Sequence, residues 1–484
     1  MHSEHALLCL LGQKCQDERL LEPLHKFIKI KQKTVKYSPV DKLTDALLAI
    51  LLDCDVVSQV NTKLAQETAV LHAFGRDQAA DQSSVQRTLS SCNSENVAQL
   101  QRALAQIFAS NSRTRRHKFG KNKKPLILDI DLTGLPCSKH YEGSCKGYFA
   151  DCKPGTTGRQ LYRVSSSQYN ELVYQQVFPG NTGSASLENF KVMLEAAFAV
   201  LALKSKHKKH VLIRLDGGFG NAPIINYLLE EGYQFVVKLG NAPRAIKMCQ
   251  SVKVDGWHSD QCHQREFGLV HSESGYSAVE SRPVYQIGVR HIPPQPQPQK
   301  ETGKVKAKAK AVKTSATSKI EVKSAEPQPY RYNVLVVRVD GLLWAEGNAT
   351  TVSESEILEQ VHFYDQRAVI ETASIKGDKQ GLGLVKRRKF NLAGQEMLVL
   401  LAQLAHNLVE WTKGWLAELE PQLAAFGTQR WVRDIFAIAG KIVFEANRIV
   451  KVQLNQRNSL ARRFHKPIAQ YFASSNIDLT LGSQ

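Results

Sequence analysis

Two apolar segments that each end in an aspartate constrain the fold of this chain more than any other feature of its sequence. Residues 125–134 read PLILDIDLTG and residues 210–220 read HVLIRLDGGFG. Both have the length and the β-branched content of buried strands. Ligands bind beyond the carboxyl ends of parallel strands in an open α/β sheet. Asp131 and Asp216 would therefore meet at one edge if the two strands are neighbours.

The first strand leaves two aspartates as candidates. Asp129 and Asp131 are two residues apart, so their side chains point to the same face. Either could contribute to a site, and we favour Asp131 because it begins the polar end of the strand, DLTG. The glycines after Asp216 would leave room for a backbone or a phosphate to approach.

The segments around these aspartates predict an α/β layer over residues 125–240. We expect further strands at 159–166, 171–179 and 233–240, and helices at 186–203 and 222–232, the second stopped by Gly232. The resulting order is β-β-β-α-β-α-β, which predicts a sheet with helices on its faces.

The rest of the chain divides by composition and periodicity. Before the α/β layer we predict a helical domain at 1–112, which could bind DNA through a helix–turn–helix pair, and a basic linker at 113–124. After the layer we predict a mostly β insertion at 241–360, with a disordered loop at about 293–329. A helical segment at 361–415 and a helical, basic C-terminal region at 416–484 follow. The linker holds seven Lys and Arg residues and no acid, so Arg113, Arg115 and Arg116 are candidate phosphate contacts.

The charge of the chain indicates a polyanionic partner. The 64 Lys and Arg residues outnumber the 45 Asp and Glu residues, which gives a formal net charge of +19. No apolar run reaches the roughly 18–20 residues that a membrane span needs, and the start of the chain lacks a secretory signal. We expect a cytoplasmic protein.

The nine cysteines are an odd number scattered along a large chain, which favours reduced thiols over a disulfide framework. Cys137, His140, Cys145 and Cys152 are all zinc-ligand types, but they lack the tight CxxC pairs that structural zinc sites usually have. Zinc binding by this group is left open.

Converging carboxylates predict a metal site at the sheet edge. Two or three carboxylates repel one another unless a cation neutralises them. Hard oxygen ligands suit Mg²⁺ or Mn²⁺. Two such ions about 3.5–4 Å apart could activate a water and stabilise a leaving oxygen at phosphorus.

Three motifs together resemble the DDE transposases of bacterial insertion sequences. They are IDLTG at 130–134, RLDGGF at 214–219 and YDQRAVIE at 364–371. The chain is most similar to the group with a Y-x2-R-x3-E-x6-K signature and a β-rich insertion between the second Asp and the Glu. The resemblance covers 125–240 and 330–415 and implies a ribonuclease-H-like catalytic core, interrupted by the insertion.

The resemblance also implies roles for individual residues. Asp131, Asp216 and Glu371 would be the catalytic metal ligands, and Tyr364 and Arg367 would contact DNA near the cleavage site. The signature lysine position holds Asp378, so Lys379 takes that role better than Lys376. A tryptophan of the insertion that stacks on a flipped base could be Trp344, or else Trp257, although a core or surface aromatic is the simpler interpretation of either.

The function that this resemblance implies is cut-and-paste transposition. The protein would bind terminal inverted repeats of double-stranded DNA, cleave the element's ends with two Mg²⁺ or Mn²⁺ ions, and join them to target DNA as a nucleoid-associated homodimer. The alternatives are a transposase-derived DNA-binding protein without catalysis and a structure-selective nuclease on the same core.

Overall fold

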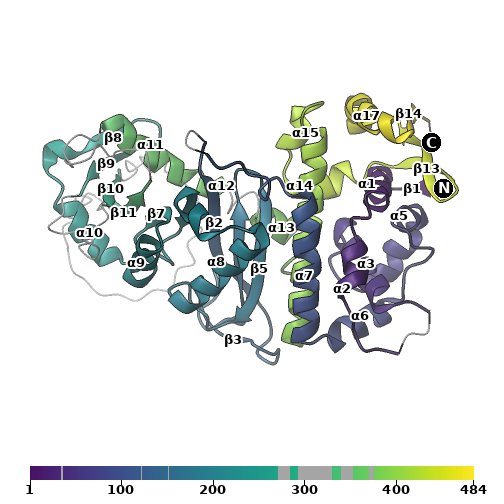
Figure 1. Ribbon diagram of the computed structural model, residues 1–484, viewed down its shortest axis with the longest axis horizontal. Helices are drawn as coiled ribbons and strands as arrows, with labels where there is room; N and C mark the ends of the chain where they lie inside the picture. The colour runs from purple at the N-terminus through teal and green to yellow at the C-terminus, as the bar shows by residue number, and fades with distance from the viewer. Residues whose placement is uncertain are drawn as a thin grey trace, which may run out of the picture.

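The computed structural model describes residues 1–33, 36–120, 123–150, 152–270, 284–292, 330–339, 353–369 and 375–483. The molecule is elongated, with the extension of the main sheet at one end and both chain termini at the other (Figure 1). No helix in these ranges is both long and apolar enough to cross a bilayer. The loop at about 293–329, predicted to be disordered, lies outside the described residues.

The central sheet contains the five strands predicted for residues 125–240. The order β5-β4-β2-β6-β7 joins β5 (Glu171–Pro179), β4 (Thr157–Ser166), β2 (Leu126–Pro136), β6 (Val211–Leu215) and β7 (Gln234–Lys238), and the short β3 (Cys145–Lys146) also pairs with β4. Strands β2, β6 and β7 are parallel, whereas β4 and β5 are antiparallel to their neighbours. The two aspartate-ending strands, β2 and β6, are neighbours, as the site hypothesis requires.

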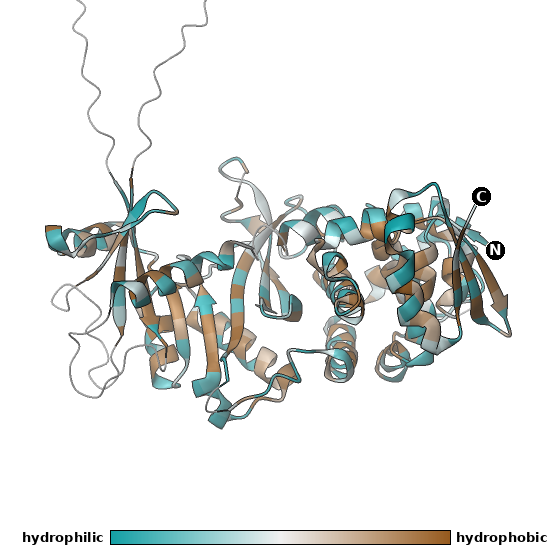
Figure 2. Ribbon diagram, turned by 90° about the horizontal axis from the view of Figure 1, so that it is seen from above, coloured by the Kyte–Doolittle hydropathy of each residue, from teal (hydrophilic) through white to brown (hydrophobic). Residues whose placement is uncertain are grey.

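The β-rich insertion extends this same sheet instead of forming a separate one. Strand β7 pairs with β11 (Arg331–Arg338), which continues to β10 (Tyr285–His291), β9 (Arg265–Leu269) and β8 (His258–Asp260). Helix α10 (Ala242–Gln250) packs on β10 and β11. Seen from above, hydrophobic strands run through the sheet into the insertion (Figure 2).

Helices cover both faces of the central strands. On one face, α8 (Leu187–Leu201) and α9 (Ala222–Glu230) pack over β4, β5 and β7, where Tyr162, Phe190 and Phe219 make ring contacts. On the other face lie α11 (Glu354–Asp365), α12 (Arg367–Val369), α13 (Lys376–Gly381) and α14 (Leu392–Leu416). This second face holds the charged residues described below.

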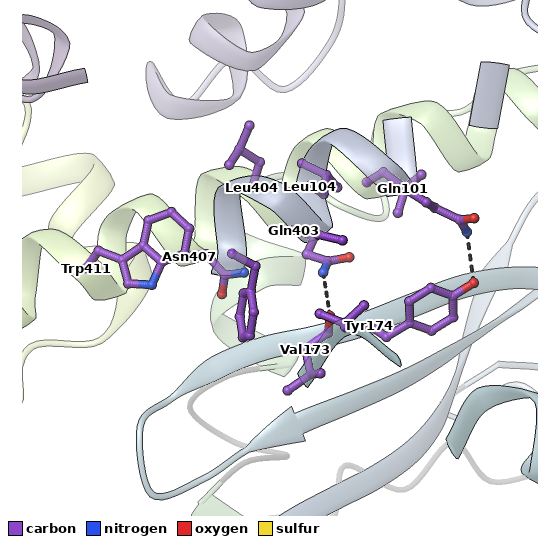
Figure 3. Close-up of a pocket in the computed structure, with 12 residues that line it drawn as sticks. Gln101, Leu104, Val173, Tyr174, Gln403, Leu404, Asn407 and Trp411 are labelled. Atoms are coloured by element: carbon purple, nitrogen blue, oxygen red, sulfur yellow. Dashed lines mark hydrogen bonds between the residues drawn. The ribbon is translucent and has the colours of Figure 1, made fainter. Parts of the chain in front are cut away.

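Helix α14 closes the open edge of the sheet at β5. The Asn407 side chain accepts from Leu172 N (2.9 Å) and donates to Leu172 O (2.9 Å), so it replaces a neighbouring strand. Gln403 donates to Val173 O, and Gln101 of α7 (Ser94–Asn111) donates to the Tyr174 hydroxyl (Figure 3). An exposed strand edge is a template for aggregation, and these side chains cover it.

The N-terminal domain is helical, as predicted. Its helices are α1 (Ala6–Asp17), α2 (Glu22–Phe27), α3 (Pro39–Leu51), α4 (Gln59–Thr62), α5 (Thr68–Ala73), α6 (Gln82–Ser91) and α7, preceded by the two-residue β1 (His2–Ser3). Ser38 caps α3 and Asn93 caps α7, each through a reciprocal capping box. Helix α7, the second member of the expected helix–turn–helix pair, packs against α2 and α14.

The C-terminal region is not all helical, so that prediction was wrong. After α15 (Pro421–Ala425) and α16 (Thr428–Arg430), the chain forms β12 (Gly440–Glu445) and β13 (Arg448–Asn455), then α17 (Ser459–Phe472) and β14 (Asp478–Gly482). Ala446 and Asn447 both have positive φ, which matches the turn that suits a tight β-hairpin. Ile442, Val452 and Leu454 are buried at alternate positions of the hairpin. Burial with a period of two is typical of strands and not of helices.

Helix α14 also carries a buried carboxyl group with an unusual protonation equilibrium. Burial raises the pKa of Glu396 to about 7. The native state therefore holds a proton that the unfolded chain releases near pH 4.3. The free energy of unfolding falls as pH rises from about 4.3 to about 7, and above that pH the full loss persists without further change.

We expect Glu396→Gln to be more stable than the parent by about 3 kcal/mol at pH 8 and equally stable at pH 4. Urea midpoints of both proteins across this pH range would measure the difference. Glu418, which is exposed and lies just after the end of α14, gives the matched control. The urea midpoint of Glu418→Gln should equal that of the parent across this pH range. A constant offset between Glu396→Gln and the parent would contradict the assignment.

Candidate functional site: a carboxylate pair at the sheet edge

The site begins where the parallel ladder between β2 and β6 ends. The last paired residues are Ile130 and Leu215, and the next residue on each strand is Asp131 or Asp216. The Asp131 side chain is 15% exposed and that of Asp216 is 37% exposed. Asp216 Oδ1 accepts from Gly218 N at 2.9 Å, which fixes the turn that follows β6.

This turn packs closely on the end of β7, which explains a glycine in the GGFG segment. A Cβ atom at Gly220 would lie 1.9 Å from Lys238 O. Only glycine lets the two backbones approach in this way. The turn, and with it Asp216, is therefore held against the neighbouring parallel strand.

A single guanidinium joins the two carboxylates. Arg367 Nη2 lies 3.2 Å from Asp131 Oδ1 and 4.0 Å from Asp216 Oδ2, and it donates to Ile130 O at 3.3 Å. Arg367 is only 4% exposed. The sequence predicted a DNA contact for this residue, which stays a prediction. In the structure its guanidinium lies between the Asp131 and Asp216 carboxylates.

Alternate residues of β2 each receive a cationic side chain on this face. Arg367 contacts Asp131, Lys379 Nζ donates to Thr133 Oγ1 at 2.7 Å, and Arg214 pairs with Asp129. Lys379, favoured as the signature lysine, thus reaches the strand of Asp131. Three cationic side chains therefore line this face of β2, two of them paired with an aspartate and one with a threonine hydroxyl.

Asp129, the alternative first ligand, is bound elsewhere. Arg214 Nε lies 2.7 Å from Asp129 Oδ1 and its Nη2 lies 3.0 Å from Oδ2, with both side chains almost fully buried. Arg214 also donates to Phe363 O of α11. A bidentate pair of this kind uses both carboxylate oxygens of Asp129, whereas Asp131 shares the Arg367 guanidinium with Asp216.

Asp378, which occupies the position of the signature lysine, is bound through both of its carboxylate oxygens. Asp378 contacts Arg163 of β4 through Oδ2 and His406 Nδ1 of α14 through Oδ1, the latter at 2.7 Å. All three side chains are at most 3% exposed. Although burial opposes ionisation, His406 and Arg163 hold the pKa of Asp378 below its ordinary value. Burial lowers the pKa of His406, but Asp378 raises it more, and the net shift is upward.

The remaining candidates of the signature and the insertion are placed as follows. Tyr364 is partly buried and packs against the Ile357 and Val361 cluster. The Arg290 guanidinium stacks over the Trp257 ring, with Arg290 Cζ 4.3 Å from the ring centroid. Glu371 and Trp344 lie outside the described residues.

The basic linker is partly tied to the protein. Glu171, fully buried, accepts from Ser112 Oγ, from the backbone N–H groups of Arg113 and Thr114, and from Trp411 Nε1. The Arg113 guanidinium donates to Tyr169 O. Arg115 donates to Val200 O at 2.5 Å. Arg116 is exposed and donates to Ser110 O.

Sequence reasoning missed the partners of these charges. Arg163 and Arg214 stand inside apolar strands, RQLYRVSS and HVLIRLDGG, and both are at most 2% exposed. A charged residue inside a buried strand needs a counter-charge, and this signal could have pointed to Asp378 and Asp129. His406 carried no comparable signal within the apolar α14.

The donor set fits a hard divalent cation. Asp131 and Asp216 already converge on one cationic nitrogen, which shows that their oxygens can face a shared positive charge. Carboxylate oxygens are the ligands that Mg²⁺ and Mn²⁺ prefer. In the described part of the chain, the cysteine group at 137–152 does not gather as a metal site, and the one group of three or more metal-ligating side chains lies where the insertion meets α11.

A family model described as transposase DDE domain group 1 matches residues 3–474 of the chain. The chain belongs to this family. The resemblance to DDE transposases is thereby confirmed.

Comparison with solved structures gave weaker likenesses to two transposase complexes. The cryo-EM structure of the piggyBac transposase synaptic complex with hairpin DNA matches with a TM-score of 0.43 and 12% identity, over 90% of this chain and 80% of that chain. The crystal structure of the Mos1 mariner paired end complex with Mn matches with a TM-score of 0.16 and 15% identity, over 46% and 66%. No curated protein matches this transposase-family chain at a significant level.

Proposed function

We propose that this protein is a transposase that binds terminal inverted repeats and catalyses metal-dependent DNA cleavage and strand transfer. The observation that carries the proposal is the convergence of Asp131 and Asp216 at the ends of neighbouring parallel strands, within a family of transposase DDE domains. The strand order β5-β4-β2-β6-β7 supports a ribonuclease-H-like core.

Asp131, Asp216 and Glu371 would hold the metal ions, with Glu371 four residues after Arg367 in the sequence. Two bound Mg²⁺ or Mn²⁺ ions supply a water or hydroxyl nucleophile and stabilise the leaving oxygen at phosphorus. Arg367 supplies a positive charge beside both carboxylates, and we expect it to contact a phosphate that approaches this edge of the sheet. No Ser or Cys nucleophile is required.

The basic surface supports double-stranded DNA as the partner. An open cleft of about 820 Å³ lies between the N-terminal helices and the C-terminal region, and its four cationic side chains outnumber its two acidic ones; the cations are Lys14, Arg19, Lys26 and Arg116, and the acids are Glu18 and Glu22. Cationic side chains along such a cleft suit a phosphate backbone. A homodimer that holds two element ends would present two copies of this surface.

The test is an assay with paired inverted-repeat ends, a target plasmid and Mg²⁺. We expect cleavage at the ends followed by joining of the 3′ ends to the plasmid. Cleavage without joining would favour a structure-selective nuclease. End binding without cleavage would favour a DNA-binding protein without catalysis, and either result would overturn the proposal.

Arg116→Ala is expected to weaken DNA binding uniformly across sequences and to reduce the slope of log affinity against log salt by about one. Arg115→Ala is the matched control, because its guanidinium already donates to Val200 O. Fluorescence anisotropy at several salt concentrations measures both slopes. An unchanged slope for Arg116→Ala would remove this residue from the DNA-binding surface.

A further inference from the structure

A second cluster of metal-ligating side chains lies where the insertion meets α11, away from the carboxylate pair. Asp260 ends β8, His263 follows in the β8–β9 turn, and His362 lies on α11. One ligand atom from each lies within 4.8 Å of the other two. The three elements are adjacent at one end of the molecule (Figure 1).

Two of the three separations in this cluster match those between ligands of one metal ion, and the third is at most 4.8 Å. His362 Nε2 lies 3.1 Å and His263 Nδ1 lies 3.2 Å from Asp260 Oδ2. Metal–ligand bonds of about 2.0–2.1 Å in tetrahedral geometry place ligand atoms about 3.3 Å apart. The two imidazole rings meet edge to face, with centroids 5.2 Å apart.

A second layer of contacts orients the central carboxylate. Asp260 is 1% exposed, Arg265 Nε donates to its Oδ2 at 2.8 Å, and Cys262 N donates to its Oδ1 at 3.2 Å. Such outer contacts fix ligating carboxylates in metal sites. Arg265 also pairs with Asp365 of α11, so the two carboxylates and one guanidinium leave one net negative charge.

The exposure of the cluster gives an ion a route from solvent. The side chains of His263 and His362 are 50% and 36% exposed, whereas Asp260 is buried behind them. Two imidazoles and one carboxylate, with an open fourth position, suit a borderline transition ion better than Mg²⁺.

We infer that Asp260, His263 and His362 form a binding site for one divalent transition-metal ion, Zn²⁺ being the best fit to this donor set. The ion joins the β8–β9 hairpin of the insertion to the last turn of α11. Because α11 leads directly into Arg367, the bound ion fixes the insertion to the segment that faces the carboxylate pair.

The test uses full-length Asp216→Asn protein, in which metal binding at the carboxylate pair is weakened. After chelator treatment, Zn²⁺ is titrated in competition with a chromophoric chelator, and Co²⁺ reports coordination through its visible absorption. We expect one equivalent of Zn²⁺, bound at least about tenfold more weakly after His263→Ala or His362→Ala. Hydrogen exchange of α11 amides should slow when Zn²⁺ is added.

His258→Ala is the matched control, because His258 lies on the same strand but pairs with Glu354 at 2.8 Å. It should bind Zn²⁺ like the parent, as should Cys262→Ser. Since His263 is half exposed, its replacement leaves the fold intact and keeps the test decisive. Absence of stoichiometric Zn²⁺, undiminished affinity in His263→Ala, or loss of binding in Cys262→Ser would each overturn the inference.

Discussion

Asp216→Asn is expected to lower the rate of Mg²⁺-dependent end cleavage at least about a thousandfold while leaving end binding largely intact. The substitution preserves the size of the side chain and removes the negative charge that would face a metal ion. A metal ion contributes several kcal/mol to stabilising charge at phosphorus, and about 4 kcal/mol corresponds to a thousandfold in rate. Gel assays of cleavage and of binding, with the same labelled ends, measure both effects.

The matched control for this experiment is Asp255→Asn. Asp255 is an exposed carboxylate in the insertion, on a short turn before β8. It changes the net charge by the same amount, so any general effect of charge on DNA affinity appears in both variants. Cleavage by Asp216→Asn at the rate of the control would remove Asp216 from the proposed metal site.

Asp378→Asn is expected to lower the free energy of unfolding by about 3–5 kcal/mol. The variant leaves the Arg163 guanidinium buried without its counter-charge, and Arg163 Nε and Nη1 have no hydrogen-bond partner among the described residues. Removing one member of a buried pair costs more than the pair contributes when intact, because an uncompensated charge remains. Urea denaturation followed by tryptophan fluorescence measures the loss.

The effect of Asp378→Asn should depend on pH in a defined way. The lowered pKa of Asp378 contributes stability above about pH 4, which is lost as pH falls through the folded-state value. The raised pKa of His406 contributes stability below about pH 6.5, which is lost as pH rises through its folded-state value. The difference from the parent is therefore complete between about pH 4 and 6.5.

Asp434→Asn provides the comparison for an exposed ion pair. Asp434 lies 3.7 Å from Arg430, and both side chains are half exposed. Exposed pairs contribute at most about 1 kcal/mol, so this variant should resemble the parent. Equal stabilities of Asp378→Asn and Asp434→Asn would show that the buried triad is not a major source of stability.

The central sheet could be predicted from sequence because its signals are local. Apolar runs that end in Asp131 and Asp216 identified both strands, and β2 and β6 are the parallel neighbours that a shared edge requires. The choice between Asp129 and Asp131 was harder, since alternation places both on one face. It depends on Arg214, a side chain on the adjacent strand at the level of Asp129.

Other features depended on contacts between segments that are distant in sequence. From the sequence, Asp378 was recognised only as a departure from the signature lysine. Its partners Arg163 and His406 are 215 and 28 residues away in the sequence. Nothing local announces that Arg163 of β4 and His406 of α14 converge on it. The hairpin β12–β13 was missed for a different reason: its alternating pattern is interrupted by a register shift at Val443 and Phe444, and it is flanked by helices.

The pairing of β1 with β12 has a consequence for how the chain folds during synthesis. Ala6 N donates to Ile438 O at 2.9 Å, and Gln13 Oε1 accepts from Ile449 N at 2.8 Å, so the first helix is anchored to one of the last hairpins. The ribosome releases this hairpin only after more than 430 residues have been made. The N-terminal helices therefore remain incompletely packed until these later segments have been made, and a polypeptide that stops before residue 438 would lack the partners of Ala6 N and Gln13 Oε1.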